Sequence, residues 1–411
     1  MRKRALFVAF VTAGAAFLAA LPASADWKDA VALFQAGRYA EAAKEFEVIA
    51  AKRPKYPDAH YMLGSSLLKI DRAADAAAAF ERAVALAEGE PRYRLALVQA
   101  HLVGGNVEQA MAGLAALDPA ALPEELKPAY GQLLAIAADR TEKLAELLPT
   151  LERAAAALPD QRPLWIAAGK AHETGGDREA ALAAFRRAIA LDPADEAVAG
   201  HAVQLAWDAA KDAPSEEEGQ RWQQTAVEVA EGLTAANKTL NSLLLAGEAR
   251  SGAGDWEGAR RWFDEAAALA PEDPLPRFYQ ARCAAGLGKE AEALRLLDEA
   301  LGRKPKPDLA RRAWDLKGYA FHKLGRFAEA AAAYRKAGDA EKAAPLEAAA
   351  AQARDLAGRL VDCEKHVAEL REMLAEGKGV LPARDIAAIE QRIREASAEC
   401  DQYRLSGAAT P

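Results

Sequence analysis

The chain has 411 residues, and its balance of charged residues gives a formal net charge of −8. No run of lysine and arginine follows the first four residues, so the chain lacks the basic patch or stripe typical of nucleic-acid-binding proteins. Half of the residues are hydrophobic but only 7% are aromatic, a composition rich in alanine that suits closely packed helices.

The first 25 residues have the three-part pattern of a secretory signal peptide. Cations at positions 2–4 precede an apolar stretch over residues 5–21, and the small-residue run Ala-Ser-Ala ends at Ala25. We expect cleavage between Ala25 and Asp26, which removes three positive charges, takes the formal charge from −8 to −11 and leaves a periplasmic protein. The alternative is an uncleaved membrane anchor. No later segment is long and apolar enough to span a membrane.

From residue 26 to 344, small, aromatic and proline residues return at a spacing of 34 residues. In the clearest copy, Arg162 to Asp195, Gly169 belongs to a first helix, and Ala181 and Phe185 belong to a second. This period is typical of helical-hairpin arrays. The small residues let the helices approach closely, and the aromatic residue wedges between them. We expect the first helices to end at glycines that cap them with positive φ: Gly37, Gly105, Gly176, Gly254, Gly288 and Gly325.

These positions resemble the tetratricopeptide repeat. The resemblance implies an all-α fold, a right-handed α-solenoid of about nine helix pairs. Two pairs depart from the pattern: residues 119–159 lack the aromatic wedge, and residues 196–239 lack the closing proline. The family binds many unrelated partners, so the resemblance implies a protein–protein interaction scaffold without naming its partner.

A different pattern takes over in residues 345–405, where two heptad seams flank a glycine-containing turn and predict an antiparallel coiled-coil hairpin. In such a pair the numbers of facing residues have a constant sum, so the register that pairs Leu370 with Ile393 also pairs Cys363 with Cys400. We expect these cysteines to form a disulfide in an oxidising compartment. The alternatives are two apolar core residues or a metal site that includes His366. Residues 406–411 are expected to be a disordered tail.

The sequence contains no phosphate-binding glycine loop and no nucleophile elbow. We therefore expect no catalytic, cofactor or metal site, and an enzyme is the least favoured hypothesis. The inner face of the array offers a partner-binding groove instead, in which aromatic and arginine side chains are typical interface hot spots. The candidate groove residues are Tyr61, Gln99, Lys170, Phe278, Tyr279, Arg282, Tyr319 and His322. The alternative for the last five is burial beneath a hairpin that folds back.

We predict an extracytoplasmic scaffold that binds a peptide or helix of a cell-envelope assembly partner in its concave groove. The alternative is an accessory or regulatory subunit of a polysaccharide-export or envelope enzyme complex, with a saccharide in the groove. The hairpin would cap the open end of the array, because a last repeat otherwise exposes its stacking face. It would alternatively dock a second partner or form a homodimer.

Overall fold

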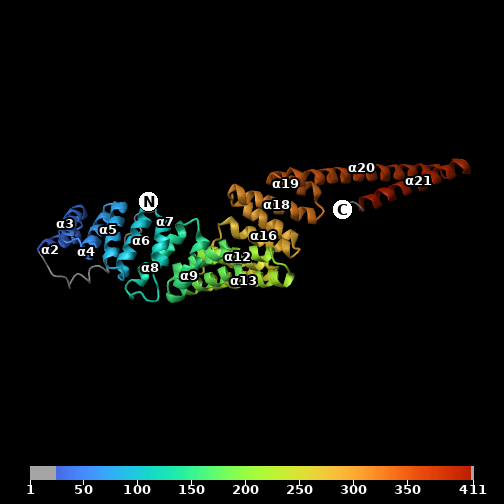
Figure 1. Ribbon diagram of the computed structural model, residues 1–411. Coiled ribbons are helices and arrows are strands. Elements are labelled where there is room, and N and C mark those ends of the chain that lie inside the picture. The colour runs from blue at the N-terminus through green and yellow to red at the C-terminus, as the bar shows by residue number, and fades with distance from the viewer. Residues whose placement is uncertain (1–24, 409–411) are drawn as a thin grey trace. The chain divides into compact units, whose positions relative to one another are not determined.

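The computed structural model describes residues 25–408, and every regular element in that range is a helix (Figure 1). Of the expected signal peptide, only Ala25 lies within the described residues, as the first residue of α2; residues 1–24 lie outside them. Residues 409–411 also lie outside. Among the described residues, no helix combines the length and the apolar character needed to cross a membrane.

Residues 25–237 form one compact unit, and its described helices pair in sequence order. The pairs are α2 (Ala25–Gln35) with α3 (Tyr39–Lys52), α4 (Pro57–Lys69) with α5 (Ala73–Leu86), α6 (Pro91–Gly104) with α7 (Val107–Ala115), α8 (Lys127–Arg140) with α9 (Leu144–Ala157), α10 (Arg162–Thr174) with α11 (Arg178–Leu191), and α12 (Glu196–Lys211) with α13 (Glu216–Ala236).

Residues 238–408 form the second unit, which contains three further helix pairs and a helical hairpin. The elements are α14 (Leu240–Gly252) with α15 (Trp256–Leu269), α16 (Pro274–Gly286) with α17 (Glu290–Gly302), α18 (Pro307–Lys323) with α19 (Phe327–Ala337), and α20 (Ala340–Gly377) with α21 (Ala383–Ala408). The described chain is therefore all-α, with nine helix pairs before the hairpin, as the spacing predicted.

Residues at the helix ends explain why the helices start and stop where they do. Pro274 occupies the first turn of α16, where its missing N–H costs no hydrogen bond, and Asp273 accepts the Leu275 N–H at 2.8 Å. Gly105 and Gly176 follow α6 and α10 with φ of 83°, a left-handed conformation that glycine adopts without steric cost. The other glycines expected at these ends also have positive φ: Gly37, Gly254, Gly288 and Gly325.

The helices of a pair approach closely because glycine on the first leaves room for an aromatic ring on the second. A Cβ atom added at Gly169 would lie 2.7 Å from the ring of Phe185, which is 1% exposed. The same arrangement recurs at Gly64 with Phe80, Gly247 with Phe263, and Gly318 with Tyr334. The predicted wedge of an aromatic residue against a small one is thus observed in both units.

Both stretches that depart from the pattern still form two helices each, but α8 and α9 barely contact each other and each packs more closely against α10. In α8/α9 a ring from the first helix, Tyr130, is fully buried beside Leu147 and Leu151, although Pro149 interrupts the hydrogen bonding of α9. In α12/α13 the second helix begins at a serine cap, Ser215, and buries Trp222. The first unit ends directly after this pair, at Asn237.

The helix α20 is continuous across the expected start of the hairpin at residue 345. It begins at Ala340, and Pro345 lies inside it. Ala343 and Leu346 pack against Tyr334 of α19, so the first turns of α20 cover the last repeat. The boundary between array and hairpin therefore falls within one helix and not at 345, because burial against α19 holds the helix together despite the proline.

The rest of α20 packs against α21 to form the hairpin, and Figure 1 shows the two helices side by side. Residues 378–382 connect them. The helix α21 continues to Ala408, so residues 406–408, expected in the disordered tail, are helical. Helix termini commonly extend or fray by such a margin, which the heptad pattern does not determine.

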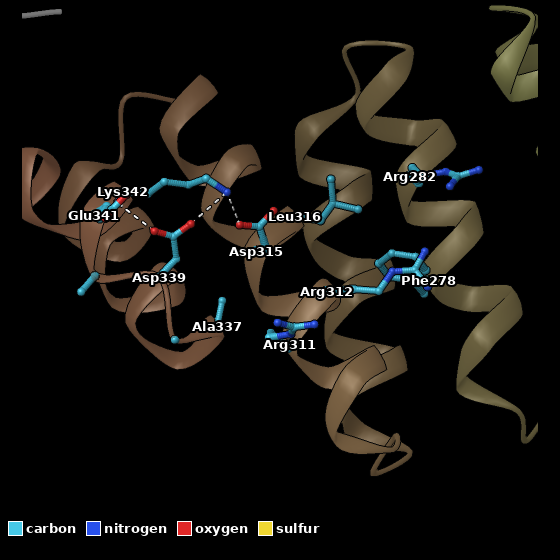
Figure 2. A pocket seen from close by; sticks show the side chains of 12 residues that line it. Phe278, Arg282, Arg311, Arg312, Asp315, Leu316, Ala337, Asp339, Glu341 and Lys342 are labelled. Atoms are coloured by element: carbon cyan, nitrogen blue, oxygen red, sulfur yellow. Dashed lines mark hydrogen bonds and ion pairs between the residues drawn. The ribbon is translucent and has the colours of Figure 1, made fainter. Parts of the chain in front are cut away.

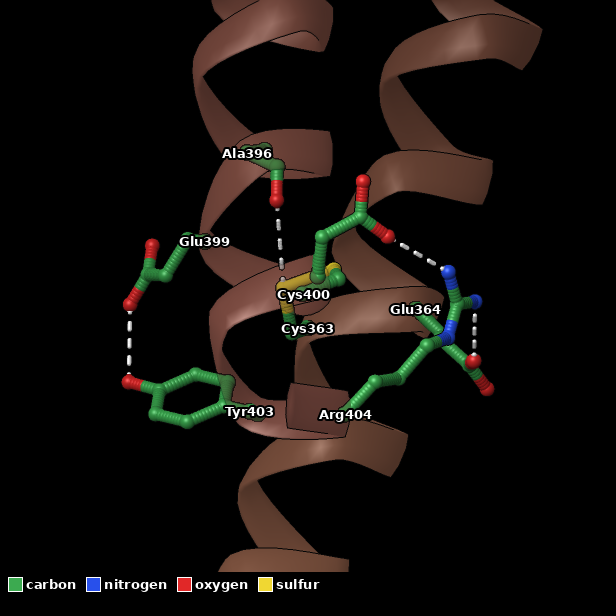
Figure 3. The surroundings of a disulfide bond; sticks show 8 residues. Cys363, Glu364, Ala396, Glu399, Cys400, Tyr403 and Arg404 are labelled. Atoms are coloured by element: carbon green, nitrogen blue, oxygen red, sulfur yellow. Dashed lines mark hydrogen bonds and ion pairs between the residues drawn. A yellow bond between two sulfur atoms is a disulfide. The ribbon is translucent and has the colours of Figure 1, made fainter. Parts of the chain in front are cut away.

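A disulfide joins the two helices of the hairpin at Cys363 and Cys400 (Figure 3), with an S–S distance of 2.04 Å and a Cα–Cα distance of 5.7 Å. This confirms the predicted pairing and its register. Leu370 and Ala396 are buried in the same seam, and Arg404 pairs with Glu364 across the two helices at 2.7 Å. Because both sulfurs are in the disulfide, neither is available as a thiolate for the alternative metal site.

Candidate partner-binding site

The second unit contains an open pocket of about 810 Å³ between α16, α18 and the start of α20 (Figure 2). Its size lies within the range of ligand-binding pockets. One wall comes from α16 and α18, and the other from the α19–α20 turn and the first turn of α20. The lining residues are Phe278, Arg282, Arg311, Arg312, Asp315, Leu316 and residues 337–342.

An ion-pair network holds the α20 wall against α18. The Lys342 ammonium lies 2.6 Å from Asp315 Oδ1 and 3.1 Å from Asp339 Oδ2 (Figure 2). Asp339 also caps α20 by accepting the Lys342 backbone N–H at 3.0 Å. The hydrogen bonds to Asp315 and Asp339 raise the pKa of Lys342, and the hydrogen bonds from Lys342 lower the pKa of Asp339. Lys342 and Asp339 therefore stay charged, and the carboxylates of Asp315 and Asp339 are both paired with Lys342.

Two neighbouring arginines of α18 form the cationic side of the pocket. The Arg312 guanidinium lies over the Phe278 ring, 4.8 Å from its centroid, and 6.0 Å from the Tyr279 centroid. Cation–π contacts of this kind favour a fixed position for the arginine. Arg311 and Arg312 are both exposed, and neither forms an ion pair with any carboxylate of the described residues. The pocket thus presents two arginine side chains to solvent.

The residues beneath this surface are fixed by contacts with α14 and α15. Tyr279 stacks on Phe263 with centroids 4.9 Å apart, and its hydroxyl donates to Glu248 at 2.6 Å. Burial, with the Glu248 hydrogen bond, raises the pKa of Tyr279 to about 12. Arg282 donates to Ser251 Oγ at 2.9 Å and lies over the Tyr279 ring. These contacts make the α16 wall a rigid support.

The structure separates the last five of the candidate groove residues. Phe278 and Arg282 line the pocket, whereas Tyr279 is 6% exposed and supports them from below. Tyr319 and His322 do not line it, because they lie one and two turns farther along α18 than Asp315. Tyr319 is 40% exposed and contacts Lys323, and His322 lies against the Phe327 ring. The five residues therefore do not form one surface.

The candidate groove residues of the first unit lie in different environments. Tyr61 packs between Phe80 and Tyr93, and burial raises the pKa of its hydroxyl. Gln99 is 7% exposed, so it is a packing residue in this structure. Lys170 is half exposed and lies 3.7 Å from Asp139. If these three residues bind a partner, they do so on a surface of the first unit that does not include the pocket of the second unit.

Sequence reasoning missed the arginines that give the pocket its charge, Arg311 and Arg312. Two consecutive arginines in the first helix of the last repeat could have indicated them, because this helix is next to the segment that follows the repeats. The hairpin did not cover this region: only the first turn of α20 contributes to the lining, as Asp339 to Lys342.

Comparisons with known proteins identify the repeats. Tetratricopeptide-repeat profiles match residues 33–93, 163–195, 244–308 and 312–341. No curated protein matches the chain in sequence.

Solved structures with a similar arrangement share little sequence with the chain. A MamA fragment from Desulfovibrio magneticus RS-1 is 16% identical over 43% of this chain and 95% of that chain, with a TM-score of 0.33. A tetratricopeptide repeat protein from Parabacteroides merdae is 16% identical over 60% and 92%, with a TM-score of 0.35. The C-terminal part of a repeat-containing protein from Cytophaga hutchinsonii is 16% identical over 63% and 98%, with a TM-score of 0.41. We draw no functional argument from these likenesses.

Proposed function

We propose that the chain is a scaffold whose second unit binds a segment of a partner protein, because tetratricopeptide-repeat profiles match four of its segments. The observation that carries this proposal is the pocket between α16, α18 and α20, which is open and large enough for several side chains. Its walls are held by packing and ion pairs before any partner arrives. A preformed site loses little conformational entropy on binding, which favours affinity.

The disulfide supports a location outside the cytoplasm. Bonds such as Cys363–Cys400 form and persist in the periplasm and other oxidising compartments, and are rare in cytosolic proteins. Together with the signal peptide expected before Asp26, this favours a bacterial periplasm and a partner in the cell envelope. The envelope-assembly role remains part of the proposal, as does the non-catalytic character of the protein.

The alternative of a saccharide in the groove receives less support from the pocket. Sugar binding commonly uses the open face of an aromatic ring, but Phe278 and Tyr279 are only 4% and 6% exposed. Arg312 lies over the Phe278 ring, and Phe263 stacks on Tyr279. A peptide needs no such open face, because it binds through charged and apolar side chains.

A substitution that fills the pocket with an uncharged side chain tests the proposal. Ala340 lines the pocket and is exposed, so Ala340→Trp should occlude it without changing its charge. Ala344 is exposed on the same helix but does not line the pocket, which makes Ala344→Trp the matched control. We would crosslink each variant in living cells, expressed with its own signal peptide, and identify the captured proteins by mass spectrometry.

We expect one or more envelope proteins to be captured by the wild type and by Ala344→Trp, and at least tenfold less by Ala340→Trp. Circular dichroism should show the same helix content for all three proteins. Capture that is equal for the two variants would contradict the pocket as the binding site.

A further inference from the structure

The charges of the pocket are divided unevenly between paired and unpaired groups. The two acidic groups next to α18, Asp315 and Asp339, are both engaged by Lys342. Arg282 is held by Ser251 and lies near Glu248. Arg311 and Arg312 have no carboxylate partner among the described residues. The charge left available on the α18 wall is therefore positive.

Arg312 is positioned to bind a carboxylate. Its guanidinium lies over the Phe278 ring and forms a side-chain hydrogen bond with Tyr279, which together hold it in place while its other N–H groups can donate to a ligand. A guanidinium binds a carboxylate through two parallel hydrogen bonds when it is held in this way, and less side-chain entropy is lost on pairing. Arg311, the preceding residue of α18, also lines the pocket. Arg312 thus forms a preorganised site for one acidic side chain, and Arg311 supplies a second positive charge.

The rest of the lining restricts what accompanies the carboxylate. Leu316, one turn after Arg312 on α18, and Ala337, at the end of α19, provide a small apolar surface beside the arginines. Glu341 lies on the α20 side of the pocket, across from Arg312 (Figure 2), and it is exposed. A negative group would be repelled there. The ligand should therefore be acidic at the α18 wall, apolar in the middle, and neutral or basic near Glu341.

We propose that the pocket binds an acidic peptide segment of the partner, with a side-chain carboxylate paired to Arg312 and Arg311 and an apolar side chain on Leu316. This inference rests on the proposed function and adds the chemistry of the ligand. A long polyanion suits the site less well, since the chain as a whole carries a net charge of −8 and repels one at a distance. A short segment needs only the local charge of the two arginines.

Selection from a library of short random peptides tests the inference without knowledge of the partner. The bait is the chain from Asp26 onward, and peptides are kept only if Ala340→Trp does not bind them. We expect Asp and Glu to be enriched several-fold over the unselected library. The enrichment should disappear with Arg311→Gln/Arg312→Gln, and affinity for the best acidic peptide should fall at least tenfold, as for the loss of a charge-assisted hydrogen bond.

Charge reversal and a matched control make the test specific. Arg311→Glu/Arg312→Glu should select peptides rich in Lys and Arg instead. Arg187→Gln/Arg261→Gln removes the same charge from exposed arginines that do not line the pocket, and should keep the acidic preference. All the substituted side chains are exposed, so helix content should not change.

The outcomes separate this inference from the proposed function. Pocket-dependent peptides without acidic enrichment, or with enrichment unaffected by Arg311→Gln/Arg312→Gln, would overturn the inference and leave the function standing. Oligogalacturonate that displaces the selected peptides and binds more tightly than they do would also overturn it, in favour of an acidic saccharide. Failure of every peptide to bind in a pocket-dependent manner would count against the proposed function itself.

Discussion

Substitution of Gly169 by alanine tests whether close helix approach, and not helix propensity, explains glycine in the first helix of a repeat. The added Cβ would lie 2.7 Å from Phe185 Cε1 and 2.9 Å from two further ring atoms. Carbon atoms pack best at about 3.5–4.0 Å, so the ring must retreat by roughly 1 Å. Phe185 is 1% exposed and its ring contacts His201 edge-on at 5.0 Å, which leaves little space for that movement.

The expected free-energy change follows from two opposing effects. Overpacking a core costs about 1–3 kcal/mol, and this site lies at the upper end because three ring atoms are too close. Alanine gains about 1 kcal/mol over glycine in a helix. We therefore expect Gly169→Ala to lower the free energy of unfolding by about 1–2 kcal/mol. Because repeats interact mainly with their neighbours, the effect should appear as faster amide hydrogen exchange in α10 and α11.

Gly200 provides the control, since it lies inside α12 and an added Cβ would meet nothing within 4 Å. Gly200→Ala should slow exchange in α12 and raise stability by about 0.5–1 kcal/mol. In the Gly169→Ala background, Phe185→Leu should cost less than it does alone, because the smaller side chain makes room for the methyl group. If Gly169→Ala stabilises the protein as much as Gly200→Ala does, the close-approach explanation is wrong.

Three further predictions concern the cysteines and one histidine. Cys363→Ala/Cys400→Ala removes a cross-link over 37 residues, so amides of α21 should lose about 4 kcal/mol of protection against hydrogen exchange. Protection of the amides of α14–α19 should stay unchanged. Equal exchange rates in α21 of the variant and the wild type would show that the disulfide adds no stability. Cys283 is fully buried, and burial raises its pKa to about 12. The native, unreduced chain should therefore not react with iodoacetamide at about pH 8, and the same chain unfolded in urea should show one reactive thiol. Three reactive thiols in the unfolded, unreduced chain would contradict the disulfide. Burial lowers the pKa of His101 in the folded state. At a pH just below the usual histidine pKa of about 6.5, His101 is therefore protonated in the unfolded state but not in the folded state, which destabilises the fold. When the pH is lowered from about 7.5 to about 5.5, the urea midpoint of the wild type should therefore decrease more than that of His101→Gln. An equal decrease in the two proteins would rule out a contribution from His101.

Much of the fold was predictable because it depends on spacing along the chain. The glycine, alanine and aromatic positions of one repeat contact each other within the same repeat, so the pairing of Gly169 with Phe185 follows from their order. The hairpin register was predictable for a similar reason: once two helices run antiparallel, matching the seams places Cys363 opposite Cys400. Such contacts need no knowledge of the rest of the molecule.

The pocket could not be predicted in the same way, because it depends on which elements pack together after the repeats end. The continuation of α20 through Pro345 and its packing on Tyr334 bring Lys342 to Asp315, and this contact creates the second wall of the pocket. Adjacent residues of α16 also have different neighbours, so the sequence could not tell that Phe278 lines the pocket while Tyr279 supports it from below. The sequence by itself determined the helix pairs, the hairpin and the disulfide, since these are local or follow from register; only the tertiary structure decided which charges remain unpaired and where they face a common cavity.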